Sequence, residues 1–228
     1  MEKIMTCDKN TQHIQKMFDE ISKYYDKMNN IISFGFHYLI KFLSIRKLNL
    51  KPRSMILDLC CGTGDFTQII SKYCPRTRVI GLDISEGMLK LAKAKNPAGV
   101  FMKGDCVNLP FENSEFDYVT MGFGLRNIED RKKALSEIYR VLDNGGKFLQ
   151  LDFGRHNFIS RVFDFIVPLF AKIMDTNENH YKYLINSKNE FPEPDDLIRE
   201  FEDAGFKYVT KCDYLFGVIS MQIMEKRF

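Results

Sequence analysis

Features of membrane-spanning and secreted proteins are missing from this chain of 228 residues. No apolar run reaches the roughly 18–20 residues that a helix needs to cross a bilayer. Residues 1–10 contain no apolar stretch of the kind found in a secretory signal, so we expect no cleaved leader there. These absences predict a cytoplasmic protein.

Closely spaced cysteines are also missing. Zinc sites and redox motifs need thiolates at short, regular spacing, and the chain has no C-x-x-C pair. We therefore expect no metal site, and interpret the cysteines as small apolar residues in a reducing compartment. They are Cys7, Cys60, Cys61, Cys74, Cys106 and Cys212.

The chain has no large excess of charge of one sign. Lys and Arg number 33 and Asp and Glu number 30, which gives a formal net charge of +3 at pH 7. A dedicated nucleic-acid binder usually carries a basic stripe or patch, and none is evident here, so no nucleic-acid partner is expected. The hydrophobic content of 45% is typical of a folded globular protein.

The first part of the chain has apolar residues at helical spacing. Residues 13–47 are predicted to be helical, with a break near Asn29 and Asn30. Pro52 ends this region. We therefore expect a helical N-terminal extension over residues 1–50, which could form a lid, and one main domain over residues 51–228.

Short apolar runs then alternate with helical segments. Strands are predicted over residues 54–59, 78–82, 100–103, 116–121 and 147–153, and helices over residues 65–73, 86–95 and 131–142. The last of these helices is expected to stop at residues 144–146 (N-G-G). Such alternation is typical of parallel β-α units in a doubly wound sheet. Near the C-terminus, a helix over residues 195–204 precedes two strands, 206–212 and 218–224, which could form an antiparallel hairpin at the sheet edge.

Residues 156–174 interrupt the alternation because they are densely apolar. This density indicates either a core helix with a kink before Pro168 or a helix with an apolar face toward a greasy ligand or a bilayer surface.

Two glycines follow Asp58 where a strand passes into a helix. Gly62 and Gly64 allow a tight turn and close approach of a ligand to the backbone, and the helix start adds free N–H groups. A dinucleotide fingerprint would place a third glycine at Thr67, and no Gly-Lys-Ser/Thr of a phosphate-binding loop follows. The loop therefore predicts a nucleoside ligand other than NAD or a triphosphate.

Acidic residues follow the next two strands. The carboxylate of Asp83 could accept hydrogen bonds from both hydroxyls of a ribose. Asp105 could accept from an exocyclic amine, with the backbone N–H of Cys106 nearby. Each aspartate alone is more often a cap, but three such features on consecutive strand ends favour a binding site.

Together these motifs resemble the pattern of class I S-adenosylmethionine-dependent methyltransferases. The matching blocks are residues 57–64 (L-D-L-C-C-G-T-G), 81–85 (G-L-D-I-S) and 104–106 (G-D-C). The resemblance implies a Rossmann-like α/β fold with a seven-stranded sheet, an antiparallel last strand and helices on both faces. It implies S-adenosylmethionine as the cofactor, bound by Asp58, Gly62, Thr63, Gly64, Asp83, Asp105, Cys106 and Gly122.

Further blocks resemble the ubiquinone/menaquinone biosynthesis C-methyltransferase family. They are residues 18–22 (F-D-E-I-S), 25–29 (Y-D-K-M-N) and 123–127 (F-G-L-R-N), within a likeness that covers residues 14–216. Gly122 departs from this family, where a small hydroxyl residue is common. The resemblance implies carbon methylation of a prenylated quinol, either demethylmenaquinol or a 2-polyprenyl-6-methoxy-1,4-benzoquinol of ubiquinone biosynthesis.

This reaction needs an ionised ring hydroxyl, because the carbon of a neutral phenol is a poor nucleophile. A phenol has a pKa of about 10, and a nearby cation lowers it. Arg126 could supply that cation and Asn127 could bond to a ring oxygen. Alternatively, Arg126 pairs with a structural carboxylate such as Glu129 or Asp130.

After methyl transfer the ring carbon must lose its proton to a base or an activated water. Asp152, Tyr25, His37 and His156 are candidates, and each could instead have a structural role. Spacing alone does not choose among them.

Two other functions stay open at this stage. One is methylation of another small metabolite or lipid, and the other is a non-catalytic cofactor-binding role beside a quinone-pathway enzyme. For the quinol reaction we expect a prenylated partner, a possible peripheral contact with the inner face of the membrane through residues 156–174, and a possible homodimer.

Overall fold

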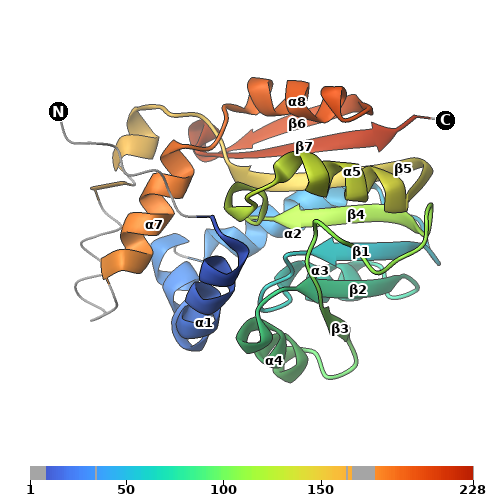
Figure 1. Ribbon diagram of the computed structural model, residues 1–228, viewed down its shortest axis with the longest axis horizontal. Helices are drawn as coiled ribbons and strands as arrows, with labels where there is room; N and C mark the ends of the chain where they lie inside the picture. Colours follow the sequence, from blue (N-terminus) through green and yellow to red (C-terminus); the bar gives the residue numbers. More distant parts are fainter. Residues whose placement is uncertain (1–8, 34, 163, 166–177, 228) are drawn as a thin grey trace.

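A computed structural model describes residues 9–33, 35–162, 164–165 and 178–227, and for residues 178–181 the backbone alone. At its centre is a seven-stranded sheet in the order β3-β2-β1-β4-β5-β7-β6 (Figure 1). The strands are β1 (Met55–Leu59), β2 (Arg78–Asp83), β3 (Val100–Lys103), β4 (Phe116–Gly122), β5 (Leu142–Phe153), β6 (Phe206–Tyr214) and β7 (Ile219–Lys226).

Strands β1 to β5 run parallel to one another, and β7 is antiparallel to both β5 and β6. The predicted doubly wound sheet with an antiparallel last strand is therefore confirmed. The predicted hairpin is also present, with β6 at the sheet edge and β7 paired between it and β5.

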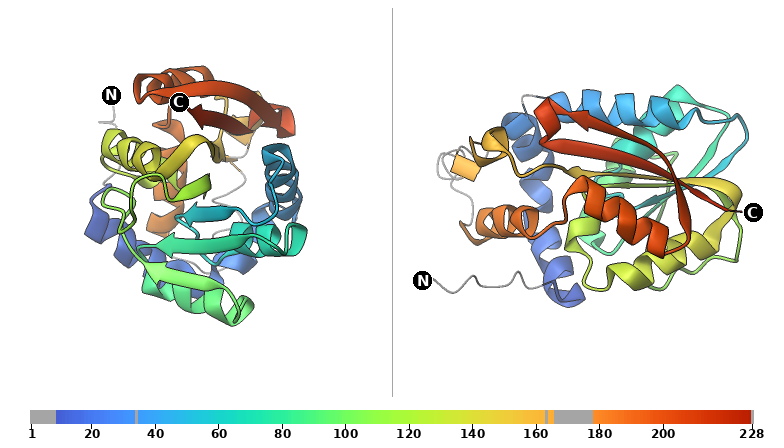
Figure 2. Two further views of the ribbon diagram at one scale, coloured as in Figure 1. Left: turned by 90° about the vertical axis from the view of Figure 1, so that its right-hand side faces the viewer. Right: turned by 90° about the horizontal axis from the view of Figure 1, so that it is seen from above.

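Helices cover both faces of the sheet (Figure 2). They are α1 (Thr11–Ser33), α2 (Phe36–Leu48), α3 (Asp65–Tyr73), α4 (Glu86–Lys95), α5 (Arg131–Val141), α7 (Glu178–Asn189) and α8 (Pro194–Asp203), with short 3₁₀ turns η1 (Leu125–Asn127) and η2 (Leu215–Gly217). The side chains of α5 and α8 share one buried cluster, and those of α2 and α3 share another.

Strand β1 shows how the sheet separates these two cores. Its side chains alternate between faces, as in any strand. Leu57 and Leu59 join the cluster of α5 and α8, whereas Ile56 joins that of α2 and α3. A strand buried on both faces explains why the sequence reads there as a continuous apolar run.

Two predicted boundaries are wrong. Helix α1 passes through Asn29 and Asn30 to Ser33, and the chain turns instead at Gly35, whose φ of 76° lies in the left-handed region that favours glycine. Helix α5 ends at Val141, and residues 144–146 lie inside β5, because β5 begins before them and shifts its register against β4.

The apolar segment 156–174 is only partly described. Residues 158–162 and 164–165 are helical, whereas residues 163 and 166–174, with the kink expected before Pro168, lie outside the described residues. Helix α7, which had no counterpart in the sequence prediction, lies with α1 beyond the carboxyl ends of the parallel strands (Figure 1). No helix in the described part of the chain is both long and apolar enough to cross a membrane.

Candidate active site

Two neighbouring cavities lie at the carboxyl-end edge of the parallel strands. Phe18 and Tyr25 of α1 and Phe123 after β4 line both of them. The ends of β1, β2 and β4 contribute to the first cavity, and α1, α2 and α7 contribute to the second. This is the edge of an open α/β sheet at which ligands bind.

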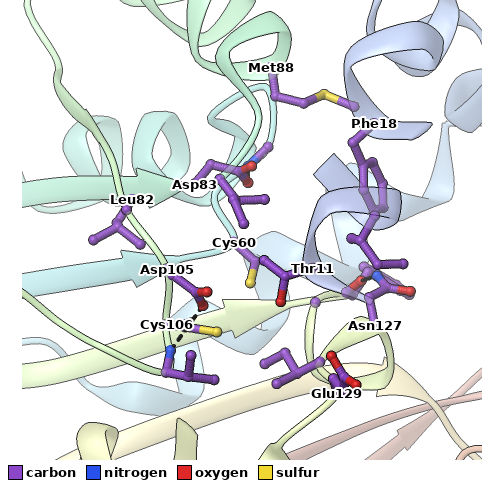
Figure 3. Close-up of a pocket in the computed structure, with 18 of the residues that line it drawn as sticks. Thr11, Phe18, Cys60, Leu82, Asp83, Met88, Asp105, Cys106, Asn127 and Glu129 are labelled. Carbon is purple, nitrogen blue, oxygen red and sulfur yellow. Dashed lines mark hydrogen bonds between the residues drawn. The ribbon is translucent and has the colours of Figure 1, made fainter. Parts of the chain in front are cut away.

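Asp83 and Asp105, the two carboxylates that the sequence predicts at this site, line the first cavity (Figure 3). Asp83 accepts hydrogen bonds from the backbone N–H groups of Gly62 at 2.8 Å and Ser85 at 2.9 Å. Asp105 accepts from the N–H of Val107 at 3.1 Å. Burial raises the pKa of Asp83, and the backbone hydrogen bonds oppose that rise. Both carboxylates are therefore fixed in place at the cavity wall.

The two glycines of the loop have different surroundings. Gly62 has a φ of 54° and lines the first cavity, and a Cβ added there would meet no atom within 4 Å. Gly64 has a φ of 81°, and its Cβ would lie 3.2 Å from Ala92 and Phe101. Gly62 thus keeps the backbone open toward a ligand, whereas Gly64 allows α4 and β3 to pack closely.

The predicted residues Asp58 and Thr63 do not line either cavity. Asp58 is fully buried and accepts from the N–H and hydroxyl of Thr67 at 3.0 and 2.7 Å and from the hydroxyl of Thr120 at 2.8 Å. Burial raises its pKa to about 6. Thr63 donates to Asp26 at 2.7 Å. Both residues hold the loop in position.

Gly122 and Cys106 line the first cavity. A Cβ at Gly122 would lie 2.6 Å from the ring of Phe66, so the small hydroxyl residue expected there would require that ring to shift. The Cys106 thiol is hydrogen bonded to Cys60, which, together with burial, raises the pKa of the Cys60 thiol well above its usual range. The Cys60 thiol is therefore a neutral part of the wall.

Arg126 lines the second cavity and is paired with Asp152, not with Glu129 or Asp130. Its Nη1 donates to Oδ1 of Asp152 at 2.9 Å and to the carbonyl of Phe123 at 2.5 Å. Nε of Arg126 and Oδ2 of Asp152 are buried without a hydrogen-bond partner. Burial raises the pKa of Asp152 although Arg126 opposes it, and Asp152 lines neither cavity.

His37 also lines the second cavity, and neither of its buried ring nitrogens has a hydrogen-bond partner. Burial and the nearby Lys41 lower its pKa to about 4, so the imidazole is neutral at pH 7. Lys41 itself donates to Asp65 at 2.7 Å. The cavity thus offers a neutral imidazole and a guanidinium N–H within an otherwise largely apolar lining.

The remaining predicted residues are Asn127, Tyr25 and His156. The amide of Asn127 accepts from the hydroxyl of Tyr183 at 3.0 Å and donates to a backbone carbonyl at 3.3 Å, and it lines the first cavity. Tyr25 lines both cavities. His156 lies outside both, where its N–H donates to Glu193 at 2.8 Å.

Sequence reasoning gave no role to Asp19. One of its oxygens accepts from the hydroxyl of Ser85 at 2.6 Å and from the N–H of Gly87 at 2.9 Å, so α1 binds the first turn of α4. The only signal for this contact was the block at residues 18–22, which carried a resemblance but no geometry.

Known proteins resemble this chain over nearly its whole length. The model of the ubiE/COQ5 methyltransferase family matches residues 5–226. Demethylmenaquinone methyltransferase of Staphylococcus carnosus (strain TM300) is 40% identical over 225 residues, 94% of this chain and 93% of the relative. The Staphylococcus aureus (strain JH9) protein of that name is 38% identical over 227 residues, 95% of this chain and 94% of the relative.

Solved structures show the same fold at low identity. A putative methyltransferase of Haloferax volcanii, in complex with the Trm112 activator, has a TM-score of 0.71 and 16% identity over 92% of this chain and 98% of that one. A SAM-dependent methyltransferase of Thermotoga maritima has a TM-score of 0.69 and 21% identity over 94% and 100%. The expected cofactor, S-adenosylmethionine, fits the first cavity with its fixed carboxylates and open glycine. The chain belongs to the ubiE/COQ5 methyltransferase family.

Proposed function

We propose that this enzyme transfers a methyl group from S-adenosylmethionine to a ring carbon of demethylmenaquinol and so forms menaquinol. The observation that carries the proposal is the pair of adjoining cavities, one lined by Asp83 and Asp105 and the other by His37 and Arg126. The names of relatives at 40% and 38% identity over nearly the whole chain support the same reaction.

The cofactor, when bound, supplies an electrophilic methyl group. Gly62, Asp83 and Asp105 would hold it in the first cavity, where the two carboxylates suit ribose hydroxyls and an exocyclic amine. Phe18, Tyr25 and Phe123 line both cavities and would hold the quinol ring against the donor. Alignment of this kind supplies much of the rate in a group transfer.

Arg126 would stabilise the ionised ring oxygen. Its Nε–H is a buried donor without a protein partner, and Asp152 holds the guanidinium through Nη1. A fixed, always charged donor in a water-poor cavity stabilises developing negative charge strongly. Asp152 lines neither cavity, so in this proposal it positions Arg126 and does not take a proton from the substrate.

His37 would orient the ring through a hydrogen bond to a quinol hydroxyl. Its neutral imidazole can donate from one nitrogen and accept at the other. Because its pKa is lowered to about 4, it would hold the substrate in place and would be a weak proton acceptor. In the net reaction the S–CH₃ bond of the cofactor and a C–H bond of the ring would break, a C–CH₃ bond would form, the cofactor would leave as a neutral thioether and one proton would pass to solvent.

The prenylated quinol, the peripheral membrane contact, the homodimer and the cytoplasmic location are parts of the same proposal. The names of the relatives favour the naphthoquinol, whereas no observation on this chain favours the benzoquinol of ubiquinone biosynthesis. Another small metabolite as acceptor, or a non-catalytic role, remains as an outcome of the test below.

The first experiment measures transfer of a labelled methyl group to short-tailed demethylmenaquinol and to the methoxy-benzoquinol, each reduced and oxidised. We expect transfer only to the reduced naphthoquinol, because the quinone has no hydroxyl to ionise. Arg126→Met should lower kcat about 100-fold or more while the Kd of the cofactor stays within about twofold. Arg131→Met, at a partly exposed arginine paired with Glu200, is the control and should leave kcat unchanged.

Two results would contradict the proposal. Equal transfer to the quinone and the quinol would remove the ionised oxygen from the mechanism. Cofactor binding without transfer to either ring would favour another acceptor or a non-catalytic protein.

A further inference from the structure

The short helix at residues 158–162 and 164–165 presents apolar side chains to solvent. Phe158 is 79% exposed and Phe165 is 80% exposed, and Ile159 and Val162 are also exposed. At about 100° per residue, Phe158, Val162 and Phe165 fall within about 60° of one another around the helix axis. They therefore form one apolar face directed away from the protein.

The opposite face of this helix is polar and buried. Lys188 of α7 is only 2% exposed, and its Nζ donates to the hydroxyl of Ser160 at 2.6 Å and pairs with Asp164 at 3.0 Å. A lysine is almost never fully buried unless it is paired. This buried ion pair fixes the rotation of the helix, so that its polar side points inward and its apolar side points outward.

The turn η2 extends the same apolar surface. Phe216 is 86% exposed with a φ of 56°, and its neighbour Leu215 is also exposed. The side-chain amide of Asn157 donates to the carbonyl of Phe216 at 2.8 Å, which ties the turn to the start of the helix. We call this surface the outer apolar face, and its members are Phe158, Ile159, Val162, Phe165, Leu215 and Phe216.

The outer apolar face adjoins the second cavity. Phe153 at the end of β5 and Ile219 at the start of β7 are register partners, and both line that cavity. The helix follows Phe153 in the chain, and η2 precedes Ile219. Figure 2 shows the helix, η2 and α7 together at the same end of the molecule.

Charge at the rim indicates the kind of partner. Arg161 is exposed beside the outer apolar face, about 60° from Phe158 around the helix, and Arg155 is also exposed there, with its Nε paired to Asp213 at 3.4 Å. An apolar face with arginine at its edge is the pattern of a helix that lies in the interface of an anionic bilayer. The fixed, outward direction of the apolar side chains suits immersion in lipid.

We propose that the outer apolar face docks on an anionic lipid bilayer and so places the second cavity beside the membrane. This inference rests on the proposed function, because a prenylated quinol resides in lipid. On this arrangement the tail stays in the bilayer while the ring enters the cavity between Phe153 and Arg126.

The test is sedimentation of the full chain with vesicles of phosphatidylglycerol and phosphatidylcholine in equal amounts, and with phosphatidylcholine alone. We expect binding to the mixed vesicles, reduced about tenfold for each of Phe158→Ser and Phe216→Asn. Asparagine tolerates the left-handed backbone at residue 216. Arg161→Glu should weaken binding to the anionic vesicles only. The matched control is Val100→Ser with Tyr208→Ser, at two exposed apolar residues on the opposite edge strands β3 and β6, and should bind like the wild type.

Unchanged vesicle binding in the Phe158→Ser, Phe216→Asn double variant would overturn the proposal. So would a protein dimer, detected without lipid, that this double variant dissociates, because a second copy would then occupy the face. Vesicle binding without methyl transfer to any quinol would leave this surface in place and reject the proposed function. Methyl transfer to the short-tailed quinol without vesicle binding would support the proposed function and reject the outer apolar face as a membrane-docking surface.

Discussion

At the scale of single residues, the Asp58 carboxylate joins β1 to α3 and β4 through its bonds with Thr67 and Thr120. Burial raises its pKa from 3.8 to about 6. The folded state therefore binds a proton more tightly than the unfolded chain. The stability that this group contributes is complete below about pH 4 and is lost as the pH rises through 6.

Asp58→Asn should remove this dependence on pH. Between pH 4 and 7 we expect the free energy of unfolding of the wild type to fall by about 2 kcal/mol relative to the variant. Urea unfolding at four pH values measures this difference. Asp143→Asn, at an exposed carboxylate of β5, is the control. Wild type and Asp58→Asn curves that stay parallel over this range would contradict the prediction.

Site residues that lie at the carboxyl ends of strands can be predicted from the sequence. Asp83 ends β2, Gly62 and Asp105 come shortly after β1 and β3, and parallel strands bring their carboxyl ends to one edge. The pairing of Arg126 with Asp152 was not accessible, because it depends on how β5 lies beside β4 and on where η1 turns. Spacing of 26 residues in the sequence contains no information about that contact.

At the scale of elements, periodicity predicted the helices and strands of the main domain to within a few residues. Helices α3 and α4 begin and end as expected, because glycine or serine precedes each and the apolar spacing is regular. The break between α1 and α2 was misplaced, since two asparagines are weaker helix breakers than the left-handed Gly35. Helix α7 was missed because it has few apolar residues in a regular pattern.

The contact between α1 and α4 leads to a second prediction. Asp19 accepts hydrogen bonds at the start of α4, and Thr11, Ile14 and Phe18 of the same helix line the first cavity. Asp19→Ala should therefore raise the Kd of S-adenosylmethionine about tenfold, because α1 no longer binds beside the site. Isothermal titration measures the change, and Lys23→Ala on the exposed side of α1 is the control.

Gly87→Ala tests whether the position of α1, and not the stability of α4, controls cofactor binding. A Cβ at Gly87 would lie 2.9 Å from the hydroxyl oxygen of Ser22, so it should displace α1, although alanine is the better helix former. We expect weaker cofactor binding in this variant as well. A Kd equal to that of the wild type in both variants would show that the position of α1 does not control the site.

At the scale of the whole molecule, α1 and α2 are joined to the main domain by charged groups. Lys41 of α2 lies 2.7 Å from Asp65, Lys95 of α4 lies 3.3 Å from Asp65, and Lys95 also pairs with Asp26 of α1 at 2.5 Å. Burial alone would raise the pKa of Asp65, but the two lysines hold it below its usual value. The chain of charges therefore crosses the boundary near residue 50 that the sequence predicts.

The two helices before that boundary differ in what they bury. Ile45 and Leu48 of α2 are fully buried in the cluster of β1, β5 and β7, whereas the buried apolar residues of α1 line the two cavities. Removal of residues 1–34 should thus leave a domain that unfolds in one transition and binds the cofactor at least about tenfold more weakly. Removal of residues 1–50 should cost about 5 kcal/mol more, because each large buried side chain contributes about 2–5 kcal/mol.

Urea unfolding followed by circular dichroism measures both truncations against the full chain. If the two truncated chains were equally stable, α2 would be a dispensable part of the extension and the boundary near residue 50 would stand. The opposite result, in which only the shorter deletion folds, would make α2 part of the domain. The lid would then be α1 alone, because this helix supplies Phe18 and Tyr25 to both cavities while the sheet keeps its core without it.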